Sequence, residues 1–124
     1  VAAGSPYPTY VPRTDVDGND IAGIRLPAVA VPLATYTGWG LRAEAFAGPD
    51  LCDAAGQQIP FAVTQAERIA NGDPRLSIEE RYTNQAVYVA AVAQTARDLA
   101  GERLLLAEDV TAIIADAEAT PIEP

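Results

Sequence analysis

The 124-residue chain has no histidine, no methionine and one cysteine, Cys52. Without an imidazole it cannot form a Ser-His-Asp triad, and its serines are Ser5 and Ser77 alone. A single cysteine excludes an internal disulfide, and Cys52 has no histidine to activate it, so we interpret it as a free structural thiol. Because the chain starts at Val1 rather than methionine, we expect a processed polypeptide or a piece of a longer one.

Positive charge and long apolar runs are scarce as well. Eight basic residues stand against 17 acids, giving a net charge of −9, and no cluster of arginines could neutralise phosphates. Pro27 and Pro32 interrupt the apolar runs of the first half, and the later run stops after Ala93, short of the roughly 18 residues of a membrane-spanning helix. We therefore predict a soluble, acidic chain with neither a nucleic-acid nor a membrane partner. No compartment is indicated.

Prolines and glycines recur throughout the first half of the chain. They separate short β-favouring runs such as residues 7–11 and 28–31, so we predict an extended segment over residues 1–63 without continuous helix. Aromatic residues make up only 6% of the chain, and alanine is its commonest residue. The core is therefore expected to be thin.

The second half, residues 64–120, is predicted to be helical. Thr64 and Ser77 each precede a glutamate by three positions, which is the capping-box pattern of a helix start. The predicted helices cover residues 64–70, with Gly72 as a left-handed stop, one turn after Ser77, residues 85–100 ending at Gly101, and residues 107–118. Residues 121–124 are expected to form a frayed tail.

The stretch from Thr14 to Pro27 concentrates acids and glycines and raises the question of a calcium loop. A loop starting at Asp15 would have Gly18 at its fourth position and Leu26 at its twelfth, where the calcium template needs Gly at the sixth and Glu at the twelfth. A β-hairpin near residues 14–27 fits better, with its turn at 17–19 and a strand over 21–26 that buries Ala22, Ile24 and Leu26.

Two residues are candidates for substrate binding. Arg25 could hold a substrate carboxylate, although a structural ion pair with a nearby Asp is favoured. Trp39, in a glycine-flanked aromatic loop, could line a pocket, although packing into a core of small side chains is favoured.

Other catalytic patterns are missing from the sequence. It contains no G-x-S-x-G elbow, no glycine-rich phosphate loop and no Cys/His cluster, so we predict no catalytic residue, no metal ligand and no cofactor. The acid pairs Glu79-Glu80 and Glu108-Asp109 fall in first turns of predicted helices, where capping and the helix dipole explain them.

Several segments in order resemble the C-terminal region of a large bacterial family of α/β-hydrolase-domain proteins. The most specific is Asp17-Gly-Asn19 through Gly23-Ile-Arg-x-Pro27, and the others are 7–12, 31–39, 59–61, 67–68, 72–75, 77–82 and 104–109. The family often has proline where Ala107 stands, at a first helical position where proline is optional.

The resemblance implies an α+β piece of an α/β-hydrolase-like fold. It also implies that the serine elbow and catalytic histidine lie outside this chain, whose role would be structural, with the remaining hydrolase polypeptide or another copy of the chain as partner. Arg25 or Trp39 would border the substrate cleft. The alternative is a free-standing acidic module that binds or interacts without catalysis.

Overall fold

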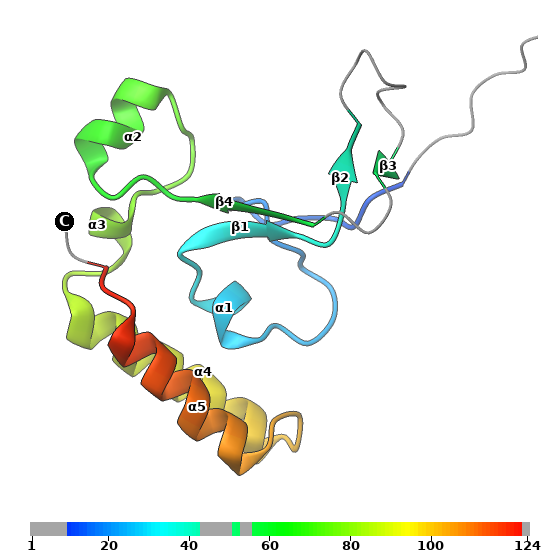
Figure 1. The fold of residues 1–124 in the computed structure, drawn as a ribbon, viewed down its shortest axis with the longest axis vertical. Helices are drawn as coiled ribbons and strands as arrows, with labels where there is room; N and C mark the ends of the chain where they lie inside the picture. The colour runs from blue at the N-terminus through cyan, green and yellow to red at the C-terminus, as the bar shows by residue number, and fades with distance from the viewer. Residues whose placement is uncertain (1–9, 43–50, 53–55, 123–124) are drawn as a thin grey trace, which may run out of the picture.

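The computed structural model describes residues 10–42, 51–52 and 56–122. These residues form an α+β arrangement, with short strands in the first half and most of the helix in the second (Figure 1). The strands are β1 (Ala34–Thr37), β2 (Gly40–Leu41), β3 (Leu51–Cys52) and β4 (Gln57–Pro60). The helices are α1 (Pro27–Ala30), α2 (Gln65–Asn71), α3 (Ile78–Arg81), α4 (Gln85–Gly101) and α5 (Ala107–Ala119).

The strands pair into two small antiparallel sheets. β1 pairs with β4 over four residues, from Ala34 opposite Pro60 to Thr37 opposite Gln57, and β2 pairs with β3. Ala34 and Thr35 are buried, whereas all four residues of β4 are exposed. The β1–β4 pair therefore has only one end packed into the molecule, where Phe61 N continues the pairing by donating to Leu33 O at 3.1 Å.

Local capping starts each of the three helices α2, α3 and α4. Thr64 accepts a hydrogen bond from Glu67 N, and Ser77 forms the complete reciprocal box with Glu80, as predicted. Asn84, for which no cap was predicted, accepts a hydrogen bond from Val87 N and starts α4. These side chains satisfy backbone amides that have no partner within the helix.

Gly72 ends α2 in the left-handed conformation at φ 65°, again as predicted. α4 behaves differently. Its last residue is Gly101, but the left-handed position falls on Arg103 at φ 64°. There the amide of Leu104 donates to Leu99 O at 2.9 Å and closes the helix end.

The core lies where α4 and α5 pack against the end of the sheet and α3. Seven buried residues form one cluster: Val31, Phe61, Ile78, Tyr88, Val92, Ala117 and Ile122. Tyr82 packs against Tyr88 edge-to-face, with ring centroids 5.2 Å apart. Its hydroxyl donates to Pro32 O at 3.0 Å, and burial raises the pKa of Tyr82 to about 12.

Three sequence-based predictions are wrong in the described residues. The hairpin near 14–27 is reduced to one bridge, Thr14 to Asp20, and no strand forms over 21–26. Ala22, Ile24 and Leu26, all predicted to be buried, are exposed, the last two at 57% and 45%, because no strand among the described residues pairs with this segment to give the alternating pattern a buried face. Residues 28–31, predicted as a β-favouring run, begin in α1 because Pro27 presets the first helical φ.

The end of the chain also differs from the expected frayed tail. Ile122 is 7% exposed, and its amide donates to Gln85 Oε1 at 3.1 Å, so the segment after α5 is tied to the start of α4. Residues 123–124 lie outside the described part. Within that part, no helix has the length and apolar character needed to cross a bilayer.

Candidate functional site

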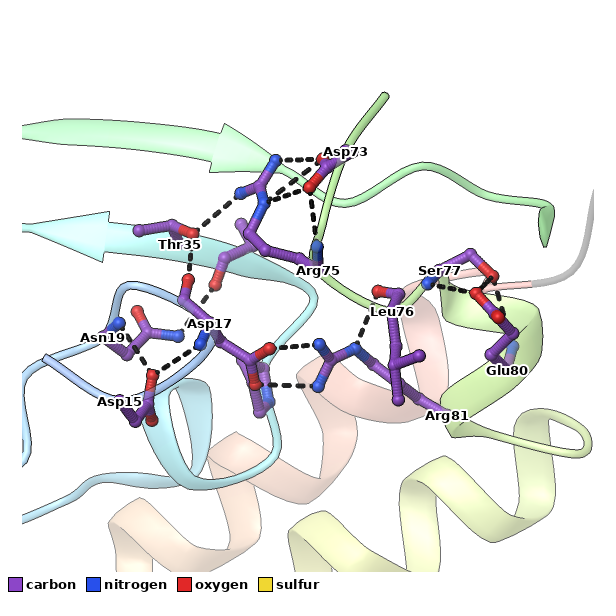
Figure 2. Close-up of polar contacts among 12 residues, drawn as sticks. Asp15, Asp17, Asn19, Thr35, Asp73, Arg75, Leu76, Ser77, Glu80 and Arg81 are labelled. Carbon is purple, nitrogen blue, oxygen red and sulfur yellow. Dashed lines mark hydrogen bonds and ion pairs between the residues drawn. The ribbon is translucent and has the colours of Figure 1, made fainter. Parts of the chain in front are cut away.

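The acid-rich loop after Thr14 folds into a tight turn held by its own side chain. Asp15 Oδ1 accepts hydrogen bonds from Asp17 N at 2.9 Å and Asn19 N at 3.0 Å (Figure 2). Burial alone would raise the pKa of Asp15, but these bonds and the Arg25 guanidinium hold it below its ordinary value. Since the Asp15 oxygens have internal partners, the loop is a structural turn, as the sequence favoured over a calcium loop.

Asn19 joins this turn to the outer edge of β1. Its side chain is fully buried, donates from Nδ2 to Ala34 O at 3.2 Å and accepts at Oδ1 from Tyr36 N at 2.7 Å. The Asn19 side-chain amide thus pairs with the Ala34 carbonyl and the Tyr36 backbone N–H, which a neighbouring strand would otherwise use. β1 is thereby shielded from strand addition along this stretch of its edge.

Asp17 connects the same turn to the helical half of the chain. Its carboxylate forms a two-point ion pair with Arg81, 64 positions away in sequence, in which Nη1 lies 2.8 Å from Oδ2 and Nη2 contacts Oδ1. Each side chain is only 13% exposed. The Arg81 guanidinium also lies 4.3 Å from the centre of the Phe61 ring, where a cation gains from the ring's negative face.

Arg75 makes a second set of contacts beside the first. Its Nη2 lies 2.6 Å from Asp73 Oδ2, and its Nη1 donates to Thr35 Oγ1 at 2.7 Å and to Ile59 O at 3.0 Å. Thr35 in turn donates to the Asp17 carbonyl. We call these five residues, Asp17, Thr35, Asp73, Arg75 and Arg81, the clamp; it joins the turn, the sheet and the α2–α3 region (Figure 2).

A third ion pair lies at the start of α3. Arg68 Nε donates to Glu80 Oε2 at 2.7 Å, and the same carboxylate oxygen accepts from Ser77 N and Ser77 Oγ. The Ser77 backbone and side-chain hydrogen bonds, with Arg68, lower the pKa of Glu80 to about 2. Ser77 is fully buried, so its hydroxyl acts as a helix cap and is not presented to a substrate.

Stability is expected to fall in acid because of Asp73 and Glu80. The hydrogen bond from Arg75 is the main cause that lowers the pKa of Asp73 from 3.8 to about 2, and Glu80 falls from 4.5 to about 2. Both carboxyls have lower pKa values in the folded state than in the unfolded state. Their contribution to folding stability is therefore complete above the unfolded-state pKa values, and it is lost as the pH falls from about 4.5 toward 2.

Urea unfolding midpoints measured between pH 6 and pH 2.5 test this dependence. The Asp73→Asn and Glu80→Gln variants should each show a shallower decline than the parent chain, since one titrating group has been removed. An identical decline in the parent and in both variants would contradict the assignment.

Gly18 is required at its position for two reasons. Its φ is +81°, and a Cβ there would lie 2.8 Å from Thr35 Cγ2. Gly18→Ala is therefore expected to destabilise the chain by about 2–3 kcal/mol, through left-handed strain together with displacement of a clamp residue.

Gly23→Ala is the matched control for Gly18→Ala. Gly23 has a similar φ of +88°, but a Cβ there meets nothing within 4 Å, so only the strain of about 1 kcal/mol should remain. Chemical denaturation of both variants measures the difference. Equal costs would show that the approach of Gly18 to Thr35 is unimportant.

The two substrate-binding candidates occupy separate places. Arg25 Nη2 contacts Asp15 Oδ2 at 2.6 Å and Val29 O at 3.0 Å, which confirms the favoured ion pair with a nearby Asp. Its Nε atom is buried without a hydrogen-bond partner among the described residues, as is Trp39 Nε1. Trp39 is half-buried beyond β1, and its carbonyl accepts from Thr37 Oγ1 at 2.6 Å. Substrate contact by either residue stays a prediction.

Arg75 and Arg81, which organise the clamp, were not predicted as site residues. They lie in the segments 72–75 and 77–82 that carry the family resemblance, but nothing local in the sequence indicates that Arg81 meets Asp17. Cys52 is exposed and free. In the described part of the chain, no three His, Cys, Asp or Glu side chains group as a metal site.

Beside the turn, an open recess of about 580 Å³ is lined in part by clamp residues, including Asp17, Thr35 and Arg75. Arg75 lines the recess, but its guanidinium is already paired with Asp73, so it offers no free positive charge there. The contacts of the clamp fix the backbone of the turn relative to β1 and α3.

The chain matches the model of a known protein family. The family model described as an alpha/beta hydrolase domain matches residues 2–115, which is nearly the whole chain. Searches of curated proteins and of solved structures returned no significant match. The matched range includes the acid-rich turn, both arginines of the clamp and all of α4. The chain therefore belongs to the alpha/beta hydrolase domain family.

Proposed function

We propose that this chain is the C-terminal structural segment of a bacterial α/β-hydrolase-family esterase or related hydrolase, whose catalytic serine and histidine lie outside it. The observation that carries the proposal is the absence of histidine in a member of a hydrolase family. Acyl transfer by a serine needs a base to accept its proton, and no imidazole is available here.

The environment of Ser77 supports the same proposal. Its hydroxyl lies 2.7 Å from Glu80 Oε2, and that carboxylate is also engaged by Arg68. A buried serine inside a capping box has no open face for an ester carbonyl. The clamp gives this segment a different use, which is to hold the turn after Thr14 in a fixed position relative to the helices.

Exposed apolar side chains support packing against a further polypeptide surface. Ile21, Ile24 and Leu26 are 45%, 57% and 45% exposed within one short segment that follows the clamped turn. Burying these side chains against a partner would stabilise the pair by about 25 cal/mol per Å² of apolar area. The proposed partner is the rest of the hydrolase or another copy of this chain, and Arg25 and Trp39 would then border the substrate cleft.

Native purification tests the proposal. The protein is isolated from its source without denaturation, labelled with a fluorophosphonate probe of activated serines, and analysed by intact mass and size exclusion. We expect the label on a serine outside this sequence, in a polypeptide that contains the chain or co-purifies with it. A folded, unlabelled monomer of 13.0 kDa with no companion would contradict the proposal and favour a free-standing binding module.

A further inference from the structure

A separate apolar cavity lies between α1, α4 and α5, away from the clamp. Its volume is about 250 Å³, and its apolar lining comes from residues 26–28 together with Tyr88, Val92, Ile113 and Ala117. An apolar cavity of about 150 Å³ is large enough to take benzene, so this one accommodates a ring with a short alkyl arm.

Three residues of the cavity lining carry polar side-chain atoms: Tyr88 on α4, and Asp116 and Thr120 at the end of α5. The Thr120 hydroxyl donates to Asp116 O at 2.8 Å, so the Asp116 carboxylate is the charged group that lines the cavity. No basic residue lines the cavity, and no ion pair to Asp116 occurs within the described residues.

The direction of α5 adds to this negative character. Asp116 and Ala117 fall in the last turn of a 13-residue helix, where the helix dipole favours a positive charge. That last turn contains no basic residue. Gln85 Nε2 satisfies the Ala117 and Thr120 carbonyls by hydrogen bonding, but as a neutral amide it supplies no compensating charge.

We propose that this cavity binds a small organic cation with an apolar arm, such as an arylalkyl ammonium. The apolar arm enters between α1, α4 and α5, and the ammonium lies beside the Asp116 carboxylate at the C-terminal end of α5. The proposal does not rest on the hydrolase role, because it uses neither the clamp nor a catalytic group; the cavity shares only Leu26 with the apolar surface proposed to meet a partner.

Binding is tested with three probes that share a phenylethyl group and differ in the charge of the head group. The folded 124-residue chain, checked by circular dichroism, is titrated at pH 7 and low salt with 2-phenylethylammonium, neutral 2-phenylethanol and anionic 3-phenylpropionate. Two-dimensional NMR follows shifts of residues lining the cavity. We expect the ammonium to bind at least about threefold more tightly than the alcohol, and the carboxylate to bind most weakly.

Two variants test the contributions of the Asp116 charge and of the apolar cavity to binding separately. Asp116→Asn, at an exposed position, should reduce the ammonium's advantage over the alcohol by about half or more without weakening alcohol binding. Ala28→Phe, also at an exposed lining position, should block all three probes. Equal binding of ammonium and alcohol by the parent chain, no saturable binding of any probe, or unchanged binding in Ala28→Phe would each overturn the proposal. If Ala28→Phe does not fold, the parent and Asp116→Asn titrations still decide it.

Discussion

Replacing Arg81 with Leu is expected to lower the free energy of unfolding by about 3–5 kcal/mol. The change removes both hydrogen bonds to Asp17 and leaves its carboxylate, only 13% exposed, without a cation. It also removes the cation over the Phe61 ring, 4.3 Å from its centre. Urea denaturation followed by circular dichroism measures the loss.

Arg97→Leu is the matched control for the Arg81 variant. Arg97 is exposed on α4 and makes no ion pair with another described residue, so its loss should change stability by less than about 0.5 kcal/mol. In the double variant Asp17→Asn/Arg81→Leu, part of the lost stability should return because no buried charge is left unpaired. A cost for Arg81→Leu as small as that of Arg97→Leu would show that the pair does not hold the two halves together.

Phe61→Ala is expected to cost about 3–5 kcal/mol as well. Phe61 is 5% exposed, belongs to the main core cluster and lies under both clamp arginines, whose guanidinium carbons are 5.0 Å and 4.3 Å from the ring centre. Truncation leaves a cavity and removes the platform for both cations at once.

Phe61→Leu separates these two contributions. Leucine keeps most of the apolar contact but has no ring, so about 1–2 kcal/mol of the loss should remain. Ile69→Ala on α2 is an exposed control, at 64% exposure, with an expected effect below about 0.5 kcal/mol. Thermal and urea unfolding of the four proteins measure the series. If Phe61→Leu were as damaging as Phe61→Ala, the apolar contact kept by leucine would contribute nothing, and this division of the loss would be wrong.

The parts of the fold that the sequence predicted correctly are those decided within a few residues. Thr64 and Ser77 cap helices through amides three positions ahead, and Gly72 ends α2 through its own backbone conformation. Arg25 was also expected to pair with a nearby Asp, and its partner is Asp15, ten positions away. Such contacts need no knowledge of how distant segments meet.

The predictions that were wrong or missing depend on contacts between segments that are far apart in the sequence. A strand over 21–26 requires a neighbouring strand to bury one face, and none of the residues that the structure describes supplies one, while Pro27 starts a helical turn directly afterwards. The Asp17–Arg81 pair spans 64 positions, and several acids and arginines were equally plausible partners by sequence alone. The sequence shows the apolar alternation of 21–26 and the charge of Arg81, but it does not show which segments lie next to them in the fold.

Three side chains of the acid-rich turn each make a structural contact. Asp15 shapes the turn, Asp17 reaches Arg81, and Asn19 occupies the edge of β1. Asp15, Asp17 and Asn19 therefore have structural partners, whereas Asp20 Oδ1 is buried without a hydrogen-bond partner among the described residues. In this chain, these three side chains hold the turn, the sheet edge and α3 together.

Ester turnover by the purified chain tests the central claim most directly. The folded 124-residue protein is incubated with p-nitrophenyl butyrate beside a Ser77→Ala variant and a no-protein blank. We expect both proteins to match the blank, because the chain has no imidazole base and its Ser77 hydroxyl is engaged by Glu80. Turnover above the blank that disappears in Ser77→Ala would contradict a purely structural role.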